Sequence, residues 1–484
     1  MRHTAAALVA GSILSLPLAC AAAQPPAASA AASGKERTPN SPESARAAAL
    51  LIGGALSDGV TYERLTELAD GIGPRLSGSP GAAAAILWAE RKFRDDGVPV
   101  HTEPVMVPHW VRGKEAAEIV SPALAGPRPL AITALGGSAA TPAGGLTAEV
   151  LEVRSLDELS ALGEKVRGKL VLFQHPMATA HDYGEYAGLR SLGPLAAAWL
   201  GAAGALVRSL ATASFRSPHT GMMKVDPAVP AIPGAALATE DAELIHRLLA
   251  QGPVSVRLEL GCQTLPDAPS FNVVAEVRGS EKPDEIVLLG AHLDSWDLAQ
   301  GAVDDGAGVV MLMETMRLLA RLPTAPRRTV RAVLFINEEN GLRGGAAYAE
   351  AHASEIGKHV VALECDIGAG APLSWTVNAG PAAVAIWQPW LKPLETLGCA
   401  GLAEGDRGGA DLSALQKRPG APAVVELIQD GTHYFDVHHS AADTLDKVNP
   451  RDLAQSTAAL AWGAWSLAQM PEAMPRPPAP KAAH

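Results

Sequence analysis

Several histidines and carboxylates in the second half of the chain directly follow apolar segments of strand length. The first is His292, which comes after segment 285–291 and stands two residues before Asp294. A histidine in this position can bind a metal ion through one ring nitrogen while a nearby aspartate holds the other nitrogen and so fixes the tautomer. An ordinary solvated turn is the alternative, so this pair needs support from the other clusters.

Two adjacent carboxylates, Glu338 and Glu339, follow the apolar segment 329–336 and Asn337. A desolvated charge needs a partner, and two of them at the end of a buried strand are difficult to explain by structure alone. A metal ion would be such a partner for Glu339. Glu338 would then remain free to take a proton from a water molecule that the metal activates.

Asp304 and Asp305 lie among glycines in segment 301–308, immediately before a predicted helix over 309–321. Acidic residues are favourable at a helix N-terminus in any case, since they cap it and interact with its dipole. In the functional interpretation, the glycines let the backbone approach closely, and the two carboxylate oxygens of Asp304 bind two cations.

Two further clusters also end apolar segments. Asp366 follows segment 360–364, and the loop after 423–428 contains His438 and His439. Each cluster alone has a simple explanation as a capped turn. In an α/β sheet, however, the carboxyl ends of the strands converge on one crevice, so these side chains are expected to meet. Histidines and carboxylates at one sheet edge are the ligands of a two-metal hydrolytic site, and this ligand set suits zinc.

An α/β domain must hold these clusters. From Phe271 onward, continuous apolar segments alternate with helical patterns, which predicts a mixed sheet with helices on both faces. The predicted strands are 272–277, 285–291, 329–336, 360–364 and 423–428. The predicted helices are 309–321, 346–352, 383–397 and 452–469.

The first half of the chain has a different texture. Segment 62–95 predicts two amphipathic helices around a Gly/Pro/Ser-rich loop at 71–80. Segment 117–261 consists of short apolar runs broken by proline and glycine, which predicts an inserted β-rich domain of short strands around one or two helices. Such an insert divides the α/β domain into an N-terminal part, 48–116, and a larger catalytic part, 262–472.

The N-terminus predicts export. Residues 1–23 combine Arg2, an apolar run and small residues, which is typical of a secretory signal peptide, and the Ala/Pro/Ser-rich segment 24–47 predicts a flexible leader. The mature protein would be periplasmic or extracellular, with anchoring as a lipoprotein through Cys20 as an alternative. Beyond the signal peptide no apolar run is long enough to span a membrane, and residues 473–484 predict a disordered tail.

Charge and cysteine content exclude other classes of protein. The chain has 39 Lys+Arg and 51 Asp+Glu, a net charge of −12, whereas a protein that binds nucleic acid needs a basic face. With 48% hydrophobic residues, it can form large cores. Cys262, Cys365 and Cys399 are widely spaced and form no structural zinc motif, so buried thiols are expected and no disulfide is assigned.

These motifs, taken in order, resemble those of the co-catalytic two-zinc exopeptidases, a family that includes bacterial leucyl aminopeptidases and glutamate carboxypeptidases. The motifs that carry the resemblance are His-x-Asp at 292–294, Gly-Ala-Val-Asp-Asp-Gly-Ala-Gly at 301–308, Glu-Glu-Asn-Gly at 338–341, Asp366 and His-Ser-Ala-Ala-Asp-Thr at 439–444. Within the family, segments 217–221, 290–297, 434–435 and 438–440 are most similar to the plasma glutamate carboxypeptidases. The resemblance covers about residues 62–470.

The resemblance implies two Zn²⁺ ions in each chain, held by residues from all five motifs. The implied zinc ligands are His292 and Asp366 for one ion, Glu339 and His439 for the other, and Asp304 between both. It further implies that Asp294 orients the histidine of its own motif and that Glu338 is the general base. His439 is preferred to His438 as the ligand because the family's ligand directly precedes the Ser/Thr of the last motif.

The resemblance also concerns the surroundings of the zinc ions. The insert resembles a protease-associated domain, which lies beside the active-site cleft in this family, and its segment 216–223 is expected to reach towards the site. Asp411, Tyr434 and His438 are the residues expected to contact substrate. Asn337 departs from the family pattern, so the loop that it begins gives no prediction of side-chain specificity.

The implied activity is that of a secreted zinc-dependent exopeptidase, a homodimer, that hydrolyses dipeptides or short peptides with a free N-terminus. An aminopeptidase of broader specificity on longer peptides is the alternative within the family. Two different functions would keep the same fold: a non-catalytic, receptor-like binding module, and a one-zinc enzyme that cyclises N-terminal glutamine. The complete ligand set and the pair Glu338 and Glu339 argue against both.

Overall fold

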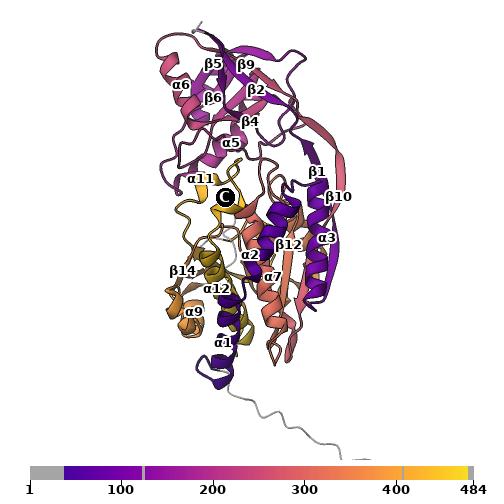
Figure 1. The fold of residues 1–484 in the computed structure, drawn as a ribbon. Coiled ribbons are helices and arrows are strands. Elements are labelled where there is room, and N and C mark those ends of the chain that lie inside the picture. The colour runs from indigo at the N-terminus through magenta and orange to yellow at the C-terminus, as the bar shows by residue number, and fades with distance from the viewer. Residues whose placement is uncertain (1–37, 123–125, 406–407, 478–484) are drawn as a thin grey trace, which may run out of the picture. The chain divides into compact units, whose positions relative to one another are not determined.

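The computed structural model describes residues 38–122, 126–405 and 408–477 (Figure 1). The predicted signal peptide, Cys20 and residues 478–484 lie outside the described residues, as does the predicted leader up to residue 37. In the part of the chain that is described, no helix has the length and apolar character needed to cross a membrane.

The larger of two sheets is mixed, as the alternation of apolar segments and helices predicts. Its strands are β1 (Val100–Val111), β10 (Gln263–Val277), β11 (Lys282–His292), β12 (Arg328–Phe335), β13 (His359–Glu364), β14 (Pro372–Val377), β15 (Leu402–Glu404) and β16 (Ala423–Gln429). They are arranged in the order β1-β10-β12-β11-β13-β16-β14-β15. The four central strands β12, β11, β13 and β16 are parallel, so their carboxyl ends lie along one edge.

Helices cover both faces of this sheet. They are α1 (Pro42–Ser57), α2 (Val60–Thr66), α3 (Pro80–Asp95), α7 (Ala307–Ala320), α8 (Arg343–Ala351), α9 (Gly380–Trp387), α10 (Ser413–Gln416), α11 (Tyr434–Val437) and α12 (Pro450–Gln469). Short helical turns cover Glu67–Ile72, Ala302–Gly306, Ala353–Lys358, Gln388–Leu397 and Leu445–Lys447.

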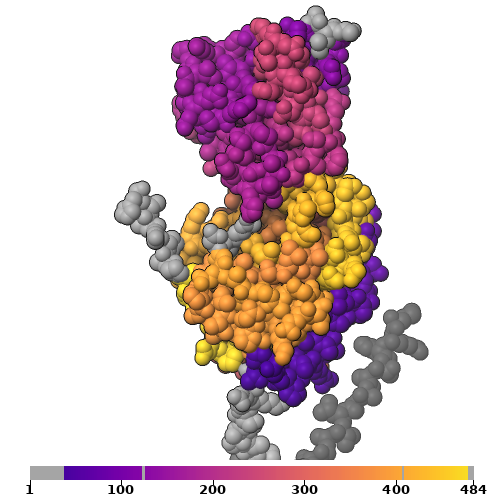
Figure 2. Space-filling view, turned by 90° about the vertical axis from the view of Figure 1, so that its left-hand side faces the viewer, coloured from indigo at the N-terminus to yellow at the C-terminus, as the bar shows by residue number. Residues whose placement is uncertain are grey.

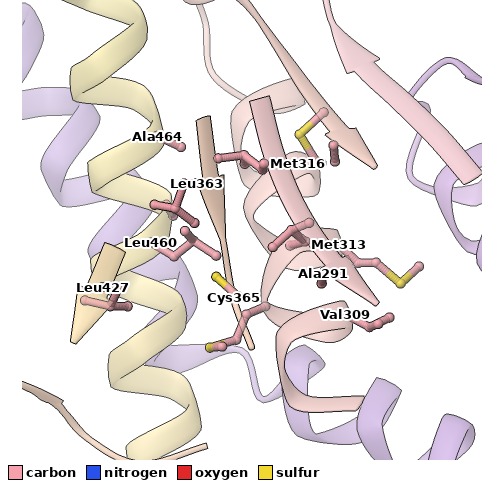
Figure 3. Close-up of a cluster of buried hydrophobic side chains, with 14 of the residues drawn as sticks. Ala291, Val309, Met313, Met316, Leu363, Cys365, Leu427, Leu460 and Ala464 are labelled. Carbon is pink, nitrogen blue, oxygen red and sulfur yellow. The ribbon is translucent and has the colours of Figure 1, made fainter. Parts of the chain in front are cut away.

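Alternate residues of each central strand pack into different layers, which is why these strands are apolar at most positions. Leu289 belongs to the main core with α7 and α12, whereas its neighbour Leu288 packs with Tyr348 of α8 on the opposite face. Figure 3 shows the main core, where Met313 of α7 and Leu460 of α12 lie against side chains of the strands.

The second sheet is built from the segment between β1 and β10 and forms the insert. Its strands are β2 (Glu115–Ser121), β3 (Arg128–Leu130), β4 (Ile132–Ala134), β5 (Leu146–Val153), β6 (Leu170–Phe173), β7 (Gly204–Arg208), β8 (Gly234–Leu237) and β9 (Ser255–Leu260), in the order β3-β2-β9-β5-β6-β7-β8-β4. Four of them, β5 to β8, are parallel.

The insert contains more helix than the sequence predicts. Instead of one or two helices it has three, α4 (Leu156–Leu162), α5 (Asp182–Trp199) and α6 (Thr239–Leu249), and a short turn at Gly163–Val166. Helix α5 escapes prediction because it contains three glycines and Pro194, residues that normally interrupt a helix. The insert is rich in strands, as predicted, and helices also connect its parallel strands.

The predicted leader and tail are both too long. Helix α1 begins at Pro42, because Ser41 caps its first turn and proline is favourable there, and Ala47 is buried in the main core. At the other end, Met474 is also buried in that core, and Arg476 donates hydrogen bonds to two backbone carbonyls. Residues 42–47 and 474–476 are therefore part of the folded protein.

Candidate metal centre

The five predicted ligands lie at the carboxyl edge of the four central strands. His292 is the last residue of β11, and Asp366 follows β13 by two residues. Glu339 lies in the loop after β12, and His439 lies just beyond the short helix α11 that follows β16. Asp304 is in the turn before α7, where its peptide bond to the next residue is cis.

The side chains of these residues form two adjacent groups that share Asp304. In the first group, the Nε2 atom of His292 lies 3.2 Å from Oδ1 of Asp304 and 3.3 Å from Oδ1 of Asp366. In the second, the Nε2 atom of His439 lies 3.0 Å from Oε2 of Glu339 and 3.4 Å from Oδ2 of Asp304. The two oxygens of one aspartate therefore face two different histidines.

Burial and crowding of like charges perturb the titration of this centre. Burial raises the pKa of Glu339 well above its ordinary value, and the negative charge of Asp304 raises it further. Burial also favours the neutral form of Asp304, but the two histidines around it outweigh this effect and lower its pKa. Burial lowers the pKa of His439 to about 3, so the ring is neutral.

Backbone carbonyls hold the far side of both rings. The Nδ1 atom of His292 lies 2.9 Å from the carbonyl oxygen of Asp294, and Nδ1 of His439 lies 3.3 Å from that of Thr220, a residue of the insert. An Nδ1–H that donates to a carbonyl leaves Nε2 free to bind a metal ion. By contrast, Nδ1 of His438 is buried and has no hydrogen-bond partner among the described residues.

Asp294 contacts the ring of His292 through its backbone carbonyl oxygen, whereas the sequence predicts a contact through its carboxylate. The carboxylate instead accepts hydrogen bonds from the backbone N–H of Glu338 at 3.0 Å and from the hydroxyl of Ser77 at 3.2 Å. Asp294 therefore fixes two parts of the centre at once, the ring of His292 and the start of the loop that holds the two glutamates.

Two residues of the loop at 71–80 support the centre, although the sequence indicates only a turn there. Arg75 is fully buried and donates hydrogen bonds to the carbonyl oxygens of Leu293 at 2.9 Å and Gly301 at 2.9 Å. It thereby ties the His292 motif to the Asp304 turn. Ser77, the second residue, contacts Asp294. An arginine beside glycine and proline is the only signal in the sequence, and it does not by itself point to a metal site.

A cavity of about 670 Å³ opens onto these groups. The catalytic domain contributes Glu338 and four of the predicted ligands, together with Tyr434 and His438, and the insert contributes Tyr183, Arg190, Met222 and Lys224. The predicted substrate contacts Tyr434 and His438 thus line the cavity. Asp411 does not: it is buried, its backbone N–H donates to Glu364, and both of its carboxylate oxygens lack a partner among the described residues.

The predicted segment 216–223 of the insert does reach the catalytic domain. His219 of this segment forms a single antiparallel β-bridge with Ser440, and just before the segment the hydroxyl of Thr212 donates to the carboxylate of Asp436 at 2.7 Å. In Figure 2 the surface of the insert, in magenta, lies against the yellow C-terminal part of the chain. Arg190, which lies near this contact on α5, is not indicated by any sequence pattern.

Comparison with known proteins assigns the family. The model of peptidase family M28 matches residues 272–462. Carboxypeptidase Q from Mus musculus is 37% identical over 444 residues, which are 91% of this chain and 93% of the relative. The chain belongs to peptidase family M28. It is therefore a metallopeptidase. Within the family it is similar to carboxypeptidase Q, which is also called plasma glutamate carboxypeptidase. The motifs of the sequence resemble the same protein.

Solved structures agree with this assignment. The crystal structure of a peptidase M28 precursor from Shewanella amazonensis matches with a TM-score of 0.85 and 41% identity, over 90% of this chain and 98% of that one. A zinc aminopeptidase from Bacillus subtilis matches with a TM-score of 0.63 at 20% identity, over 86% of this chain and 97% of that one. The second likeness shows the zinc exopeptidase fold alone.

Proposed function

We propose that this M28 peptidase is a two-zinc exopeptidase that hydrolyses dipeptides or short peptides with a free N-terminus. The observation that carries the proposal is the position of Asp304, whose two carboxylate oxygens face His292 and His439 respectively. One carboxylate between two His-and-acid groups is the arrangement expected for a pair of neighbouring cations. Similarity to carboxypeptidase Q supports the choice of short peptides as substrates.

The donor set fits two zinc ions. Imidazole and carboxylate are zinc ligands, and the Oδ2 atom of Asp304 is buried without a hydrogen-bond donor among the described residues, as an oxygen that binds a cation would be. His292 and Asp366 would hold one ion, and Glu339 and His439 the other. The carbonyl that accepts from Nδ1 of His439 supports its choice over His438, whose Nδ1 atom has no such partner among the described residues.

Glu338 is the proposed general base. Bound zinc would lower the pKa of a water molecule and polarise the carbonyl of the scissile peptide bond. The carboxylate of Glu338 lines the cavity and would accept the proton of that water, then pass it to the nitrogen of the leaving amine. The hydrogen bond from the backbone N–H of Glu338 to the carboxylate of Asp294 fixes the backbone position from which the Glu338 side chain extends. Burial raises its pKa well above the ordinary value, which suits a group that must also act as an acid.

Substitution of the base is the most direct test of this mechanism. We expect Glu338→Gln to lower kcat by about 10²- to 10⁴-fold while the protein keeps its zinc, measured by elemental analysis. Glu395→Gln, which changes an exposed glutamate, is the matched control and should retain full activity. Near wild-type turnover in Glu338→Gln would show that another group accepts the proton.

A substrate panel tests the choice of peptide. Dipeptides, longer peptides and their N-acetylated forms would be compared with zinc present, after its removal by a chelator, and after zinc is added back. Dipeptides with a free amino group should be cleaved best, and only with zinc. Faster cleavage of longer peptides would favour a broader aminopeptidase, and release of C-terminal residues from N-acetylated peptides would contradict the need for a free N-terminus. Binding of peptides without any cleavage would favour a non-catalytic module.

Three further features complete the proposal. The N-terminal sequence supports export, with residues 1–23 removed as a signal peptide. The insert would be a protease-associated domain, in keeping with its contact to the catalytic domain at His219 and Ser440. The homodimer implied by the family resemblance would appear as a doubled mass in light scattering. N-terminal sequencing of the exported protein tests the cleavage, and mass spectrometry tests for lipid on Cys20.

A further inference from the structure

The insert contacts one zinc ligand directly through its backbone. Thr220 pairs with His439 in two ways: its N–H donates to the carbonyl oxygen of His439 at 2.8 Å, and its own carbonyl oxygen lies 3.3 Å from Nδ1 of the ring. The neighbouring residues His219 and Ser440 form the β-bridge that aligns the two segments. The other ring of the centre, His292, differs, because its Nδ1 partner belongs to the catalytic domain.

The backbone of His439 needs this support. Its φ angle is +57°, in the left-handed region that non-glycine residues seldom adopt. Such a conformation persists only where surrounding contacts hold it. The hydrogen bond from Thr220 to the carbonyl oxygen of His439 is a contact of this kind, so the ring is aimed at Glu339 and Asp304 by a strained backbone fixed from outside the catalytic domain.

Arg190 of α5 fixes the carbonyl of Thr220 in turn. One terminal nitrogen of its guanidinium donates to the Thr220 carbonyl oxygen at 3.2 Å, and the other donates to the hydroxyl of Tyr183 at 2.8 Å. The guanidinium also lies 5.4 Å from the centre of the Tyr183 ring, and the residue is 8% exposed. The Thr220 carbonyl has two lone pairs, which allows it to accept from Arg190 and from His439 together.

This arrangement selects the tautomer of His439. The same nitrogen of Arg190 lies 3.5 Å from Nδ1 of the ring. If Arg190 donated to Nδ1, the ring proton would stand on Nε2, and that atom could not bind a metal ion. Arg190 instead holds the Thr220 carbonyl at the shorter distance, and a carbonyl can only accept, so the ring that pairs with it carries its proton on Nδ1 and leaves Nε2 free to face Glu339.

We infer that Arg190 and Thr220 are positioning residues through which the insert sets the zinc affinity of the His439 and Glu339 group, but not that of the His292 and Asp366 group. The inference rests on the proposed two-zinc function. It gives the insert a role beyond that of a wall of the cavity: the metal centre is complete only when the insert is folded against it.

Zinc titration of the metal-free protein tests the inference. Zinc would be added in competition with a chromophoric chelator, which reports two binding affinities in the wild type. In Arg190→Gln we expect one affinity to fall by about 10- to 100-fold and the other to stay unchanged. Arg190→Lys, which keeps a donor for the Thr220 carbonyl, should recover part of the loss. Arg208→Gln is the matched control, since Arg208 is also 8% exposed and lies in the insert, on β7, but pairs with Glu243.

A second variant displaces Arg190 without removing its charge. Gly221 has a φ angle of +149°, and a Cβ atom placed there would lie 2.3 Å from the central carbon of the Arg190 guanidinium. Gly221→Ala should therefore push the guanidinium away from Thr220 and weaken the same zinc affinity as Arg190→Gln. Nitrogen-detected NMR of the histidine rings, recorded without zinc, gives a readout independent of metal: the His439 signal should report Nδ1–H in the wild type and a mixture of tautomers in both variants.

The outcomes separate the inference from the proposed function. Unchanged zinc affinities and an unchanged tautomer in Arg190→Gln and Gly221→Ala would overturn the inference while leaving the two-zinc peptidase intact. An equal loss of both affinities, seen also in Arg208→Gln, would overturn it too, because it would show general loosening of the insert. If the wild type binds only one zinc, the proposed function fails, and the His439 tautomer in the variants still decides whether Arg190 positions the ring.

Discussion

The two sheets of this protein share a motif of parallel strands but differ in the residues at the strand ends. In the larger sheet the strands end in histidines and carboxylates that lie within 3.0 to 3.4 Å of one another, with like charges crowded together. In the insert, Arg208 at the end of β7 pairs with Glu243, which also accepts a hydrogen bond from Gln174 at 2.9 Å. Ser209 follows with a hydrogen bond to the carbonyl oxygen of Leu237 at 2.6 Å.

The difference teaches that the fold supplies the crevice and the residues at the strand ends supply the chemistry. In the insert the carboxylate of Glu243 lies beside the opposite charge of Arg208 and accepts a hydrogen bond from Gln174, so its charge is balanced without a metal ion. In the catalytic sheet burial raises the pKa of Glu339 and the negative charge of Asp304 raises it further, a repulsion that divalent cations would relieve. The insert contributes to that centre in another way, because its Thr220 contacts His439, a proposed zinc ligand.

The largest effect should follow a change at the shared carboxylate. Asp304→Asn removes the charge that lies between both histidines, so we expect loss of bound zinc, measured by elemental analysis, and a fall in activity of at least about a thousandfold. Asp241→Asn is the control in the insert: Asp241 is also buried, but its carboxylate accepts from a backbone N–H at 2.6 Å and faces no metal ligand among the described residues. A variant at position 304 that kept two zinc ions would remove the main difference between the two sheets.

The hydrophobic cores of the two sheets should lose similar stability when a buried leucine is replaced, although the strand ends of the two sheets differ. Leu289 on β11 and Leu206 on β7 are both fully buried, each in the core of its own sheet. Replacing either with alanine leaves a cavity and should lower the free energy of unfolding by about 2 to 5 kcal/mol, measured by urea denaturation. A loss below about 1 kcal/mol for Leu206→Ala alone would mean that the insert is packed more loosely than the catalytic domain.

The opposite edge of the catalytic sheet offers a histidine away from the candidate metal centre. His359 begins β13, its Nδ1–H donates to the carbonyl oxygen of Glu355, and its Nε2 accepts from Tyr348. Burial lowers its pKa to about 4, with the charge of Arg331 acting in the same direction. Between pH 6.5 and about 4 the unfolded chain therefore binds a proton that the folded protein does not, and stability should fall by up to about 1.4 kcal/mol per pH unit as the pH is lowered.

Denaturation curves at several pH values check this effect. The fall in stability should be smaller in His359→Gln, which cannot take up the proton but can still accept from Tyr348. An equal pH dependence in that variant would assign the effect to other groups.

The smallest effect should follow removal of the ion pair between Arg208 and Glu243 in the insert. Glu243→Gln removes the partner of Arg208, but the glutamate side chain is 39% exposed, so water screens the ion pair. We expect a loss of less than about 1 kcal/mol in stability and no loss of zinc. Zinc loss in this variant would mean that the strand ends of the insert and the candidate metal centre are coupled more strongly than their contacts indicate.

Much of the catalytic sheet is predictable because its strands are buried on both faces. Continuous apolar segments predict β11, β12, β13 and β16 closely, and the polar clusters after them then mark the crevice. Strand β1 is not predictable in this way, since Pro104 and Pro108 interrupt it. Strand β1 tolerates these prolines because it lies at the edge of the sheet and pairs only with β10. On its other side no strand requires the backbone N–H that proline lacks.

The candidate site is predictable only as far as local spacing carries information. The proposed ligands can be selected from the sequence because most of them stand at the end of an apolar segment, and family M28 is confirmed by comparison. Arg190 is 249 residues from His439 along the chain, and helix α5, which brings it there, contains proline and glycine. No periodicity links two such residues, so their contact follows only from how the insert folds.

The insert enters and leaves the catalytic domain through strands that pair with each other. Val111 at the end of β1 lies opposite Gln263 at the start of β10, so the whole of 112–262 is joined to the rest by two neighbouring ends. A tight hairpin turn could therefore replace it without disturbing the remaining ladder. Loss of the insert during evolution would leave the strands of the larger sheet paired, but His439 would lose its contact with Thr220.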